Sequence, residues 1–390
     1  MNWTISGGTV LSGETFETTT LSMADDRLAA GAAADAQVID ATGLLVLPGI
    51  VDIHGDGFER QIMPRPGVRF DVALALRDTD RQLVANGITT AFHGVTVSWE
   101  PGLRSLGAAE EIATVLADIR DDLSCDTRLH IRWETFALEE LATVIGWLRS
   151  EPKPIVALND HTTSTMRKGH TERKLGQWAE RCGLTREAYV ERLHAIWERR
   201  EAVSAAIERL AAAARDNGNV LLAHDETSPE ERQHFRALGA VSSEFPMNLD
   251  TARAARDAGE HVILGAPNVV RGGSHNGALD ATSAIGDGLC TVLASDYHYP
   301  SPFHAAFKLA GRDHANLAKS WKLVSENPAM AAGLSDRGRL APGARADLIL
   351  VDPNRAGGPA IVATFCGGRL VHATQALTMA MPARAAVAAA

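Results

Sequence analysis

The chain has 390 residues, of which 45% are hydrophobic and 22% are charged, the usual mixture of a globular protein. This length and composition exclude a single small domain and wholesale disorder; they fit one large α/β barrel with an accessory domain, or two ordinary domains. The net charge of −10 argues against a protein that coats nucleic acid or an anionic membrane, but it is compatible with a local basic pocket for a small anion.

The N-terminus and the cysteines indicate a cytoplasmic protein. The first residues, MNWTISGGTVLSGETF, lack a basic stretch followed by an apolar one, so we expect no signal peptide. No run approaches the roughly 18 apolar residues that a transmembrane helix needs. The four cysteines lie far apart and form no CxxC pair, which indicates thiols in a reducing compartment rather than a disulfide framework.

The two ends of the chain share one pattern. Residues 1–47 predict short strands that are separated by glycine-containing turns. The segment Leu340–Ala373, with the runs ADLILVDP and AIVATFCGGRLVHA, shows the same pattern. Two β-rich ends around a long α/β middle predict that both ends meet in one small sheet domain, formed by residues 1–47 and 338–375.

The middle of the chain carries eight apolar, β-rich runs, each followed by a stretch compatible with a helix. Runs of this length are typical of parallel strands that are buried on both faces. Their alternation with helices predicts a (β/α)8 barrel over residues 48–337. An open doubly wound sheet is the alternative, but no Gly-rich GxGxxG loop follows the first run. The runs are 45–56, 87–96, 127–135, 154–162, 219–226, 239–247, 261–268 and 289–298.

Two further segments depart from this alternation. Residues 163–215 form an unusually long, charged and helix-compatible stretch. Long insertions in barrels belong to the loops around the active site, so we expect a helical insertion or lid here. The Ala-rich residues 376–390 predict a loose C-terminal tail.

Polar side chains able to bind a metal follow five of the eight runs. The first run ends at His54-Gly55-Asp56, and residues i and i+2 of a strand point to the same side. In a barrel, the carboxyl ends of all strands meet at the face where function is found. This convergence predicts a metal centre. The other strand ends carry Glu134, Asp160-His161, His224-Asp225 and Ser295-Asp296.

The motif LPGIVDIHGD, the late SD and the closing LAPGARADLILVDP make the chain similar to the amidohydrolase superfamily over roughly residues 1–373. The resemblance implies a metal-dependent hydrolase whose barrel carries a small β-sandwich built from both termini. It also implies a set of metal ligands, with Glu134 in the bridging position. The set is His54, Asp56, Glu134, His161, His224 and Asp296.

The sequence departs from the superfamily pattern in three places. The first strand has His-x-Asp, where most members have His-x-His. The later histidines fall on the fourth and fifth runs rather than on strands five and six; this indicates either a miscount by one strand or an effect of the segment 163–218 on the topology. None of the six lysines follows a strand, so a carboxylated lysine cannot bridge two metals, and Glu134 is the candidate for that role.

A narrower resemblance rests on three motifs, MPRPGV, GAPNVVRGGSHNG and LASDYHYP. Together they resemble the family of alpha-D-ribose 1-methylphosphonate 5-triphosphate diphosphatases of phosphonate degradation, with which the His-x-Asp motif also agrees. The resemblance implies release of pyrophosphate from a phosphorylated ribosyl substrate. It implies one or two divalent ions; the histidines favour zinc, and the carboxylates leave manganese or iron open.

The same resemblance gives roles to individual residues. Asp296 lies where the superfamily places the catalytic base. Arg271 in its Gly-rich loop offers a donor fork for an anion, although a structural loop arginine is the alternative. For Arg167 and Lys168 the alternative is a solvated helix face. The candidate substrate-binding residues are Arg65, Arg167, Lys168, Arg271, Gly272, Gly273, Ser274 and His275.

Two other functions compete with the phosphoanhydride hydrolase. The first is hydrolysis of a C–N bond in a cyclic amide or a deaminase substrate, which is the general habit of the superfamily. The second is a non-catalytic scaffold that has lost its metal, but all six expected ligand positions hold residues able to bind one. We expect no nucleic-acid or membrane partner, and a homo-oligomer is compatible with the sequence.

Overall fold

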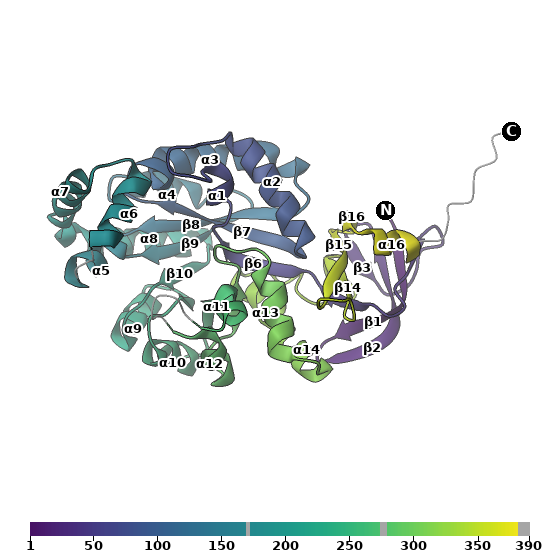
Figure 1. Cartoon of the computed structure of the whole chain (residues 1–390). Coiled ribbons are helices and arrows are strands. Elements are labelled where there is room, and N and C mark those ends of the chain that lie inside the picture. The colour runs from purple at the N-terminus through teal and green to yellow at the C-terminus, as the bar shows by residue number, and fades with distance from the viewer. Residues whose placement is uncertain (169–171, 274–278, 381–390) are drawn as a thin grey trace.

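The structure, a computed structural model, describes residues 1–168, 172–273 and 279–380. It consists of a large α/β body and a smaller sheet that lies to one side of it (Figure 1). The first and the last strand of the chain both belong to the small sheet, so both ends of the described chain come together there.

The large body is built around eight parallel strands that pair in the order of the sequence. At the seam, the last strand returns to the first: the amide N–H of Asp296 donates to His54 O over 2.9 Å, and that of Asp56 donates to Asp296 O over 2.9 Å. This confirms the eight predicted strands and their count. They are β6 (Ile50–Gly55), β7 (Ile88–Val97), β8 (Asp126–Glu134), β9 (Ile155–Asn159), β10 (Leu221–His224), β11 (Ser242–Glu244), β12 (His261–Gly265) and β13 (Val292–Ala294).

A buried carboxylate fixes the seam below the site. Asp52 on β6 accepts hydrogen bonds from the backbone N–H of Ser295 over 2.9 Å and from its hydroxyl over 2.6 Å. Burial raises the pKa of Asp52 to about 6, although the bonds from Ser295 oppose the rise. A side chain at Gly55 would place its Cβ 2.7 Å from the Asp52 carboxylate, so only glycine fits where the two strands meet.

Helices follow most barrel strands, and several begin at a residue whose side chain caps the first turn. Asp71, Ser105, Ser228 and Asn248 each accept a hydrogen bond from a backbone N–H three residues later. None of the helices among the described residues combines the length and apolar character needed to span a bilayer. The helices of the body are α1 (Glu59–Ile62), α2 (Val72–Ala85), α3 (Leu106–Ile119), α4 (Leu141–Trp147), α9 (Pro229–Ala237), α10 (Leu249–Asp257), α11 (Ala266–Arg271), α12 (Ala281–Gly286), α13 (Ser301–Ala310), α14 (His314–Lys322) and α15 (Glu326–Ala331).

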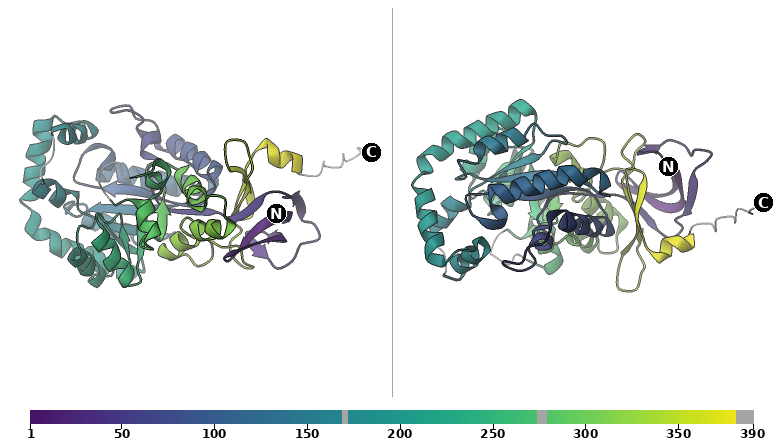
Figure 2. Two further views of the ribbon diagram at one scale, coloured as in Figure 1. Left: turned by 60° about the horizontal axis from the view of Figure 1, so that its bottom comes forward. Right: turned by 90° about the horizontal axis from the view of Figure 1, so that it is seen from above.

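Four more helices occupy the long stretch between β9 and β10, the part of the chain where we expected a helical insertion or lid. Figures 1 and 2 show α5, α6 and α7 on the side of the barrel away from the small sheet. Because α5 begins directly after β9, its first residue, His161, stays at the carboxyl end of the barrel. The four are α5 (His161–Lys168), α6 (Glu172–Cys182), α7 (Arg186–Trp197) and α8 (Val203–Asn217).

The small sheet joins both ends of the chain, as the sequence predicts. Its centre is the antiparallel pair β5–β14, in which Leu348 lies opposite Pro48, and all eight strands form one hydrogen-bonded sheet. Its core includes Trp3 and Phe365, whose rings meet edge to face at 5.4 Å. Helix α16 (Gln375–Ala380) follows the last strand. The strands are β1 (Trp3–Ser12), β2 (Thr15–Ala24), β3 (Arg27–Ala29), β4 (Gln37–Asp40), β5 (Leu45–Pro48), β14 (Leu348–Asp352), β15 (Ala360–Cys366) and β16 (Arg369–Ala373).

Candidate metal centre

Three groups of side chains at the carboxyl end of the barrel could hold a metal ion, judged over the described residues. In each group the nitrogen and oxygen atoms that could act as ligands lie within 4.8 Å of one another. We name them by position: the seam group lies where the barrel closes, the α5 group includes the start of α5, and the buried triad lies below both. They are His54, Asp56 and Asp296 (seam group); His161, His224 and Asp225 (α5 group); and His54, His130 and Glu244 (buried triad).

The seam group combines a neutral imidazole with two carboxylates. Burial and the charge of Arg132 hold the pKa of His54 well below its usual range, which leaves the ring neutral and able to bind a metal. Burial and the nearby Asp56 raise the pKa of Asp296 to about 7, and Arg132 opposes that rise. Asp296 follows β13 with a φ of 54°, and Gly265 on the neighbouring strand leaves room for its carboxylate.

The α5 group is arranged around one carboxylate oxygen. Asp225 Oδ2 lies 3.2 Å from His161 Nε2 and 3.1 Å from His224 Nδ1. Burial would raise the pKa of Asp225, but the two histidines outweigh it and hold the pKa well below its usual range. Asp225 has a φ of 59°, a left-handed conformation that is uncommon outside glycine and concentrates at functional sites.

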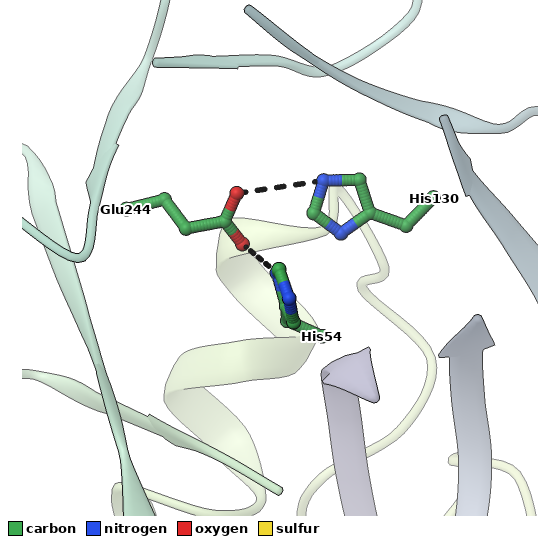
Figure 3. Close-up of side chains that lie close together, drawn as sticks. All are labelled: His54, His130 and Glu244. Atoms are coloured by element: carbon green, nitrogen blue, oxygen red, sulfur yellow. Dashed lines mark hydrogen bonds and ion pairs between the residues drawn. The ribbon is translucent and has the colours of Figure 1, made fainter. Parts of the chain in front are cut away.

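The buried triad orients the imidazole of His54 (Figure 3). His54 Nδ1 donates to Glu244 Oε1 over 2.8 Å, which leaves His54 Nε2 for a metal. His130 Nδ1 donates to the carbonyl oxygen of Ile53 over 2.8 Å, and its Nε2 lies 3.5 Å from Glu244 Oε2. His54, His130 and Glu244 are at most 1% exposed, so the triad supports the site from inside the barrel.

Arg132 lies between the seam group and the α5 group. Its Nη1 is 3.6 Å from Asp56 Oδ2, and its Nη2 donates to His224 Nε2 over 3.4 Å. Arg132 is 5% exposed and alternates along β8 with His130 and Glu134, so all three point to the same face of that strand. The site therefore contains a buried cation as well as carboxylates.

Glu134, the expected bridging ligand, holds the start of α5. Its Oε1 accepts hydrogen bonds from the hydroxyl of Thr162 over 2.7 Å and from its N–H over 3.2 Å. Its Oε2 accepts from the N–H of His161 over 3.1 Å and lies 4.0 Å from the Nδ1 of that ring. Burial raises the pKa of Glu134 to about 7. Among the described side chains, Glu134 belongs to none of the three groups, and its role as a metal ligand stays a prediction.

Buried polar atoms without a hydrogen-bond partner in the protein surround these groups. Both amide atoms of Asn159, at the end of β9, have none. The hydroxyls of Thr96 and Thr135 also lack one. Such atoms are rare in native interiors and mark places where ions, water or ligands bind. The donor set and these atoms therefore fit a divalent metal.

Two neighbouring cavities open at the site. One, of about 160 Å³, is lined by the seam group, Arg132, His224 and Asp225, and also by Asn268 after β12. The other, of about 170 Å³, is lined by all three residues of the α5 group and by Arg167. Both cavities share His224 and Asp225, which gives a substrate two directions in which to extend from the ligand groups.

The structure places the other expected substrate residues unevenly. Arg271 ends α11 at the rim, is exposed, and donates to the Tyr297 hydroxyl over 3.4 Å; Tyr297 itself follows Asp296. Gly272 and Gly273 have φ values of 82° and 125° that side chains rarely adopt.

Arg65 lines neither of the two cavities. Arg65 is exposed in a turn that it forms with Val68. Ser274, His275 and the side chain of Lys168 lie outside the described residues.

Three residues of the site, Glu244, His130 and Arg132, were not predicted, and Asp225 was named among the metal-capable strand ends but not in the ligand set. Asp225 and Glu244 end predicted strand runs, so the rule that selected His54 and Asp296 applies to them too. His130 and Arg132 precede Glu134 by four and two residues, and the period of two along a strand was the available signal.

Comparison with known proteins identifies the family of the chain. Residues 156–372, more than half of the chain, match the sequence model of the amidohydrolase family. The chain belongs to the amidohydrolase family. This amidohydrolase is 32% identical over 323 residues to the alpha-D-ribose 1-methylphosphonate 5-triphosphate diphosphatase of Escherichia coli strain K12, which covers 80% of this chain and 85% of the relative. The chain is therefore a hydrolase that is similar to that diphosphatase.

Solved structures show the same fold at low sequence identity. An amidohydrolase from an environmental sample of the Sargasso Sea matches with a TM-score of 0.64 and 14% identity over 96% of this chain and 93% of that one. A beta-aspartyl dipeptidase from Fervidobacterium islandicum AW-1 matches with a TM-score of 0.61 and 15% identity over 96% and 97%. These likenesses show the barrel and its accessory sheet, but they say nothing about the substrate.

Proposed function

We propose that this amidohydrolase is a metal-dependent hydrolase of a phosphoanhydride, which releases pyrophosphate from alpha-D-ribose 1-methylphosphonate 5-triphosphate. The observation that carries the proposal is the 32% identity to a diphosphatase of that name over 80% of the chain. The site supports it, because a buried arginine stands among the ligand groups, where a polyanionic substrate would bind.

The cofactor would be one or two divalent ions. The seam group would hold one, and the α5 group would hold the other, with zinc favoured by the histidines and manganese or iron compatible with the carboxylates. A divalent ion in this position lowers the pKa of water toward neutrality and neutralises charge on phosphoryl oxygens.

The residues of the chain supply the proton transfer and the positioning. Asp296, a partly buried carboxylate at the end of β13, would accept the proton of the attacking water. The water oxygen bonds to the α-phosphorus, the bond from that phosphorus to the bridging oxygen breaks, and pyrophosphate leaves, so one phosphate remains on the sugar. Asp225 and Glu244 orient the imidazoles of the site.

The substrate would contact the strand-end loops around the two cavities. Arg167 lines the cavity beside His161, and Arg271, Gly272 and Gly273 lie at the rim after β12, the strand next to β13. The loops after the seventh and eighth strands of barrels often hold phosphate. Arg65, Lys168, Ser274 and His275 remain candidates from the sequence.

Phosphorus NMR of the metal-loaded protein with a ribosyl 5-triphosphate tests this proposal. We expect pyrophosphate and a sugar monophosphate as products. The Arg271→Ala variant should weaken turnover by about 1.5–3 kcal/mol, the contribution of a hydrogen bond to a charged group. The matched control is Arg355→Ala, because Arg355 is an exposed arginine on the β14–β15 loop of the small sheet. Hydrolysis of hydantoins or amides with no action on triphosphates would contradict the proposal.

A further inference from the structure

Arg132 is a basic side chain in the wall of the cavity that the seam group lines. Of the described residues that line that cavity, it is the one arginine or lysine, among the carboxylates of Asp56, Asp225 and Asp296. It is 5% exposed, and β8 carries it into the barrel. A buried guanidinium among metal-competent groups needs an explanation, because a buried charge is unfavourable unless it is paired.

The contacts that Arg132 makes within the protein leave most of its hydrogen-bonding capacity unused. The distance of 3.6 Å to Asp56 Oδ2 exceeds a normal hydrogen bond, and the distance of 3.4 Å to His224 Nε2 is long. The Nε has no hydrogen-bond partner. A guanidinium has five N–H donors in a planar fork, so Arg132 can still donate to an anion in the cavity.

Ion binding would remove the negative charge that Arg132 now faces. Asp56 belongs to the seam group and Asp225 to the α5 group, so divalent ions there would neutralise both carboxylates. The guanidinium would then lie beside cations, which is favourable only when an anion comes between them. A polyphosphate brings this anion, whereas a neutral amide does not.

We propose that Arg132 determines specificity by donating to non-bridging oxygens of the polyphosphate, an inference that rests on the proposed function. The guanidinium fork matches two phosphoryl oxygens at once, which a lysine cannot do. Gly94 on the neighbouring strand β7 leaves space for the Arg132 side chain, because a Cβ there would lie 3.3 Å from Arg132 Cδ and 3.6 Å from His54 Nε2.

Binding of inorganic pyrophosphate to the metal-loaded holoenzyme, measured by calorimetry, tests the inference without turnover. We expect Arg132→Gln to weaken pyrophosphate binding about 100-fold, because it removes a charged partner from a desolvated site. Arg132→Lys should weaken it about 10-fold, because lysine keeps the charge but not the donor fork. The metal content of both variants should equal that of the wild type. Guanidinium ions should restore part of the binding to Arg132→Ala, which a structural role would not predict.

The matched control is Arg128→Gln. Arg128 lies on the same strand and face, four residues before Arg132. It pairs with Asp126 over 2.9 Å at the other end of the barrel. We expect its pyrophosphate affinity to stay within about twofold of the wild type, because Arg128 lies near the start of β8 and does not line the cavity.

Three results would overturn the inference: no pyrophosphate binding by the wild type, unchanged binding by Arg132→Gln, or loss of metal together with binding in that variant. Failure of the proposed function gives a different result. If the wild type binds pyrophosphate through Arg132 yet does not cleave the ribosyl triphosphate, the proposed function falls and the anion site stands.

Discussion

The seam group and the α5 group offer similar ligands but are held in different ways. The seam group lies where β6 meets β13, and His54 in it is 1% exposed and fixed by Glu244 over 2.8 Å. The α5 group lies nearer the surface, with the His161 side chain 44% exposed and the group arranged around Asp225.

This difference shows two ways of preparing a metal site on one barrel. Strand pairing and a buried carboxylate fix the seam group before any ion arrives, so little rearrangement accompanies binding there. The α5 group depends on the position of a helix start, which Glu134 holds through the N–H groups of His161 and Thr162. We therefore expect changes at the seam group to have larger effects than equivalent changes at the α5 group.

The largest effect should come from Asp296→Asn. Asparagine keeps the shape and a weak ligand oxygen but cannot accept a proton, so the rate should fall by about 10²–10⁴-fold with the fold and most metal binding retained. Steady-state kinetics with metal analysis checks this. A variant that keeps more than about a tenth of the wild-type rate would exclude Asp296 as the base.

Glu244→Gln should have the next largest effect. It removes the carboxylate that accepts from His54 Nδ1, and loss of such a partner lowers metal affinity or activity by about 10–100-fold. Metal titration against a chelator measures the change, and the exposed Glu230→Gln on α9 is the control. Equal affinities in the two variants would show that the buried triad does not prepare the seam group.

His161→Ala should have a smaller effect, about tenfold on turnover, because its ring is partly exposed and its group is less fixed. Elemental analysis should show that the ion at the α5 group is lost first, and the exposed His234→Ala on α9 should change nothing. Loss of all metal in His161→Ala would mean that the two groups act as one site.

The smallest effect should be the change of metal affinity with pH at the seam group. Burial raises the pKa of Asp296 to about 7, so below pH 7 an ion must displace a proton, and affinity should rise with pH and level off above about 7. In the absence of metal, the raised pKa of Asp296 stabilises the fold at pH values below the ordinary pKa of an aspartate. This contribution to the free energy of unfolding is lost as the pH rises through 7. Calorimetry from pH 5 to 8 measures both trends, and Asp296→Asn should flatten them.

The sequence predicted the barrel and the meeting of its polar strand ends, because both follow from local patterns. Eight apolar runs set the strands, and a polar residue after a run must lie at the carboxyl end of the barrel. The pattern does not show what else a polar residue at a strand end contacts: Glu134 accepts hydrogen bonds from the N–H groups at the start of α5, which its place after a run does not predict. Arg132 was not predicted because its place depends on contacts with residues 76 and 92 positions away in the chain.

The small sheet also depends on contacts between distant segments, which local sequence patterns do not predict. Its strands could be predicted from the turns in residues 1–47, but the pairing of Leu348 with Pro48 joins segments 300 residues apart. No local pattern specifies such a partner, and only the similarity of the two ends indicated that they meet.

Anomalous scattering from crystals of the metal-loaded protein, recorded on both sides of the zinc absorption edge, tests the metal centre most directly. The account predicts a strong peak between His54, Asp56 and Asp296, and a second peak, if present, between His161, His224 and Asp225. Active, metal-containing crystals with no peak at either group, or with the ion bound elsewhere on the protein, would contradict it.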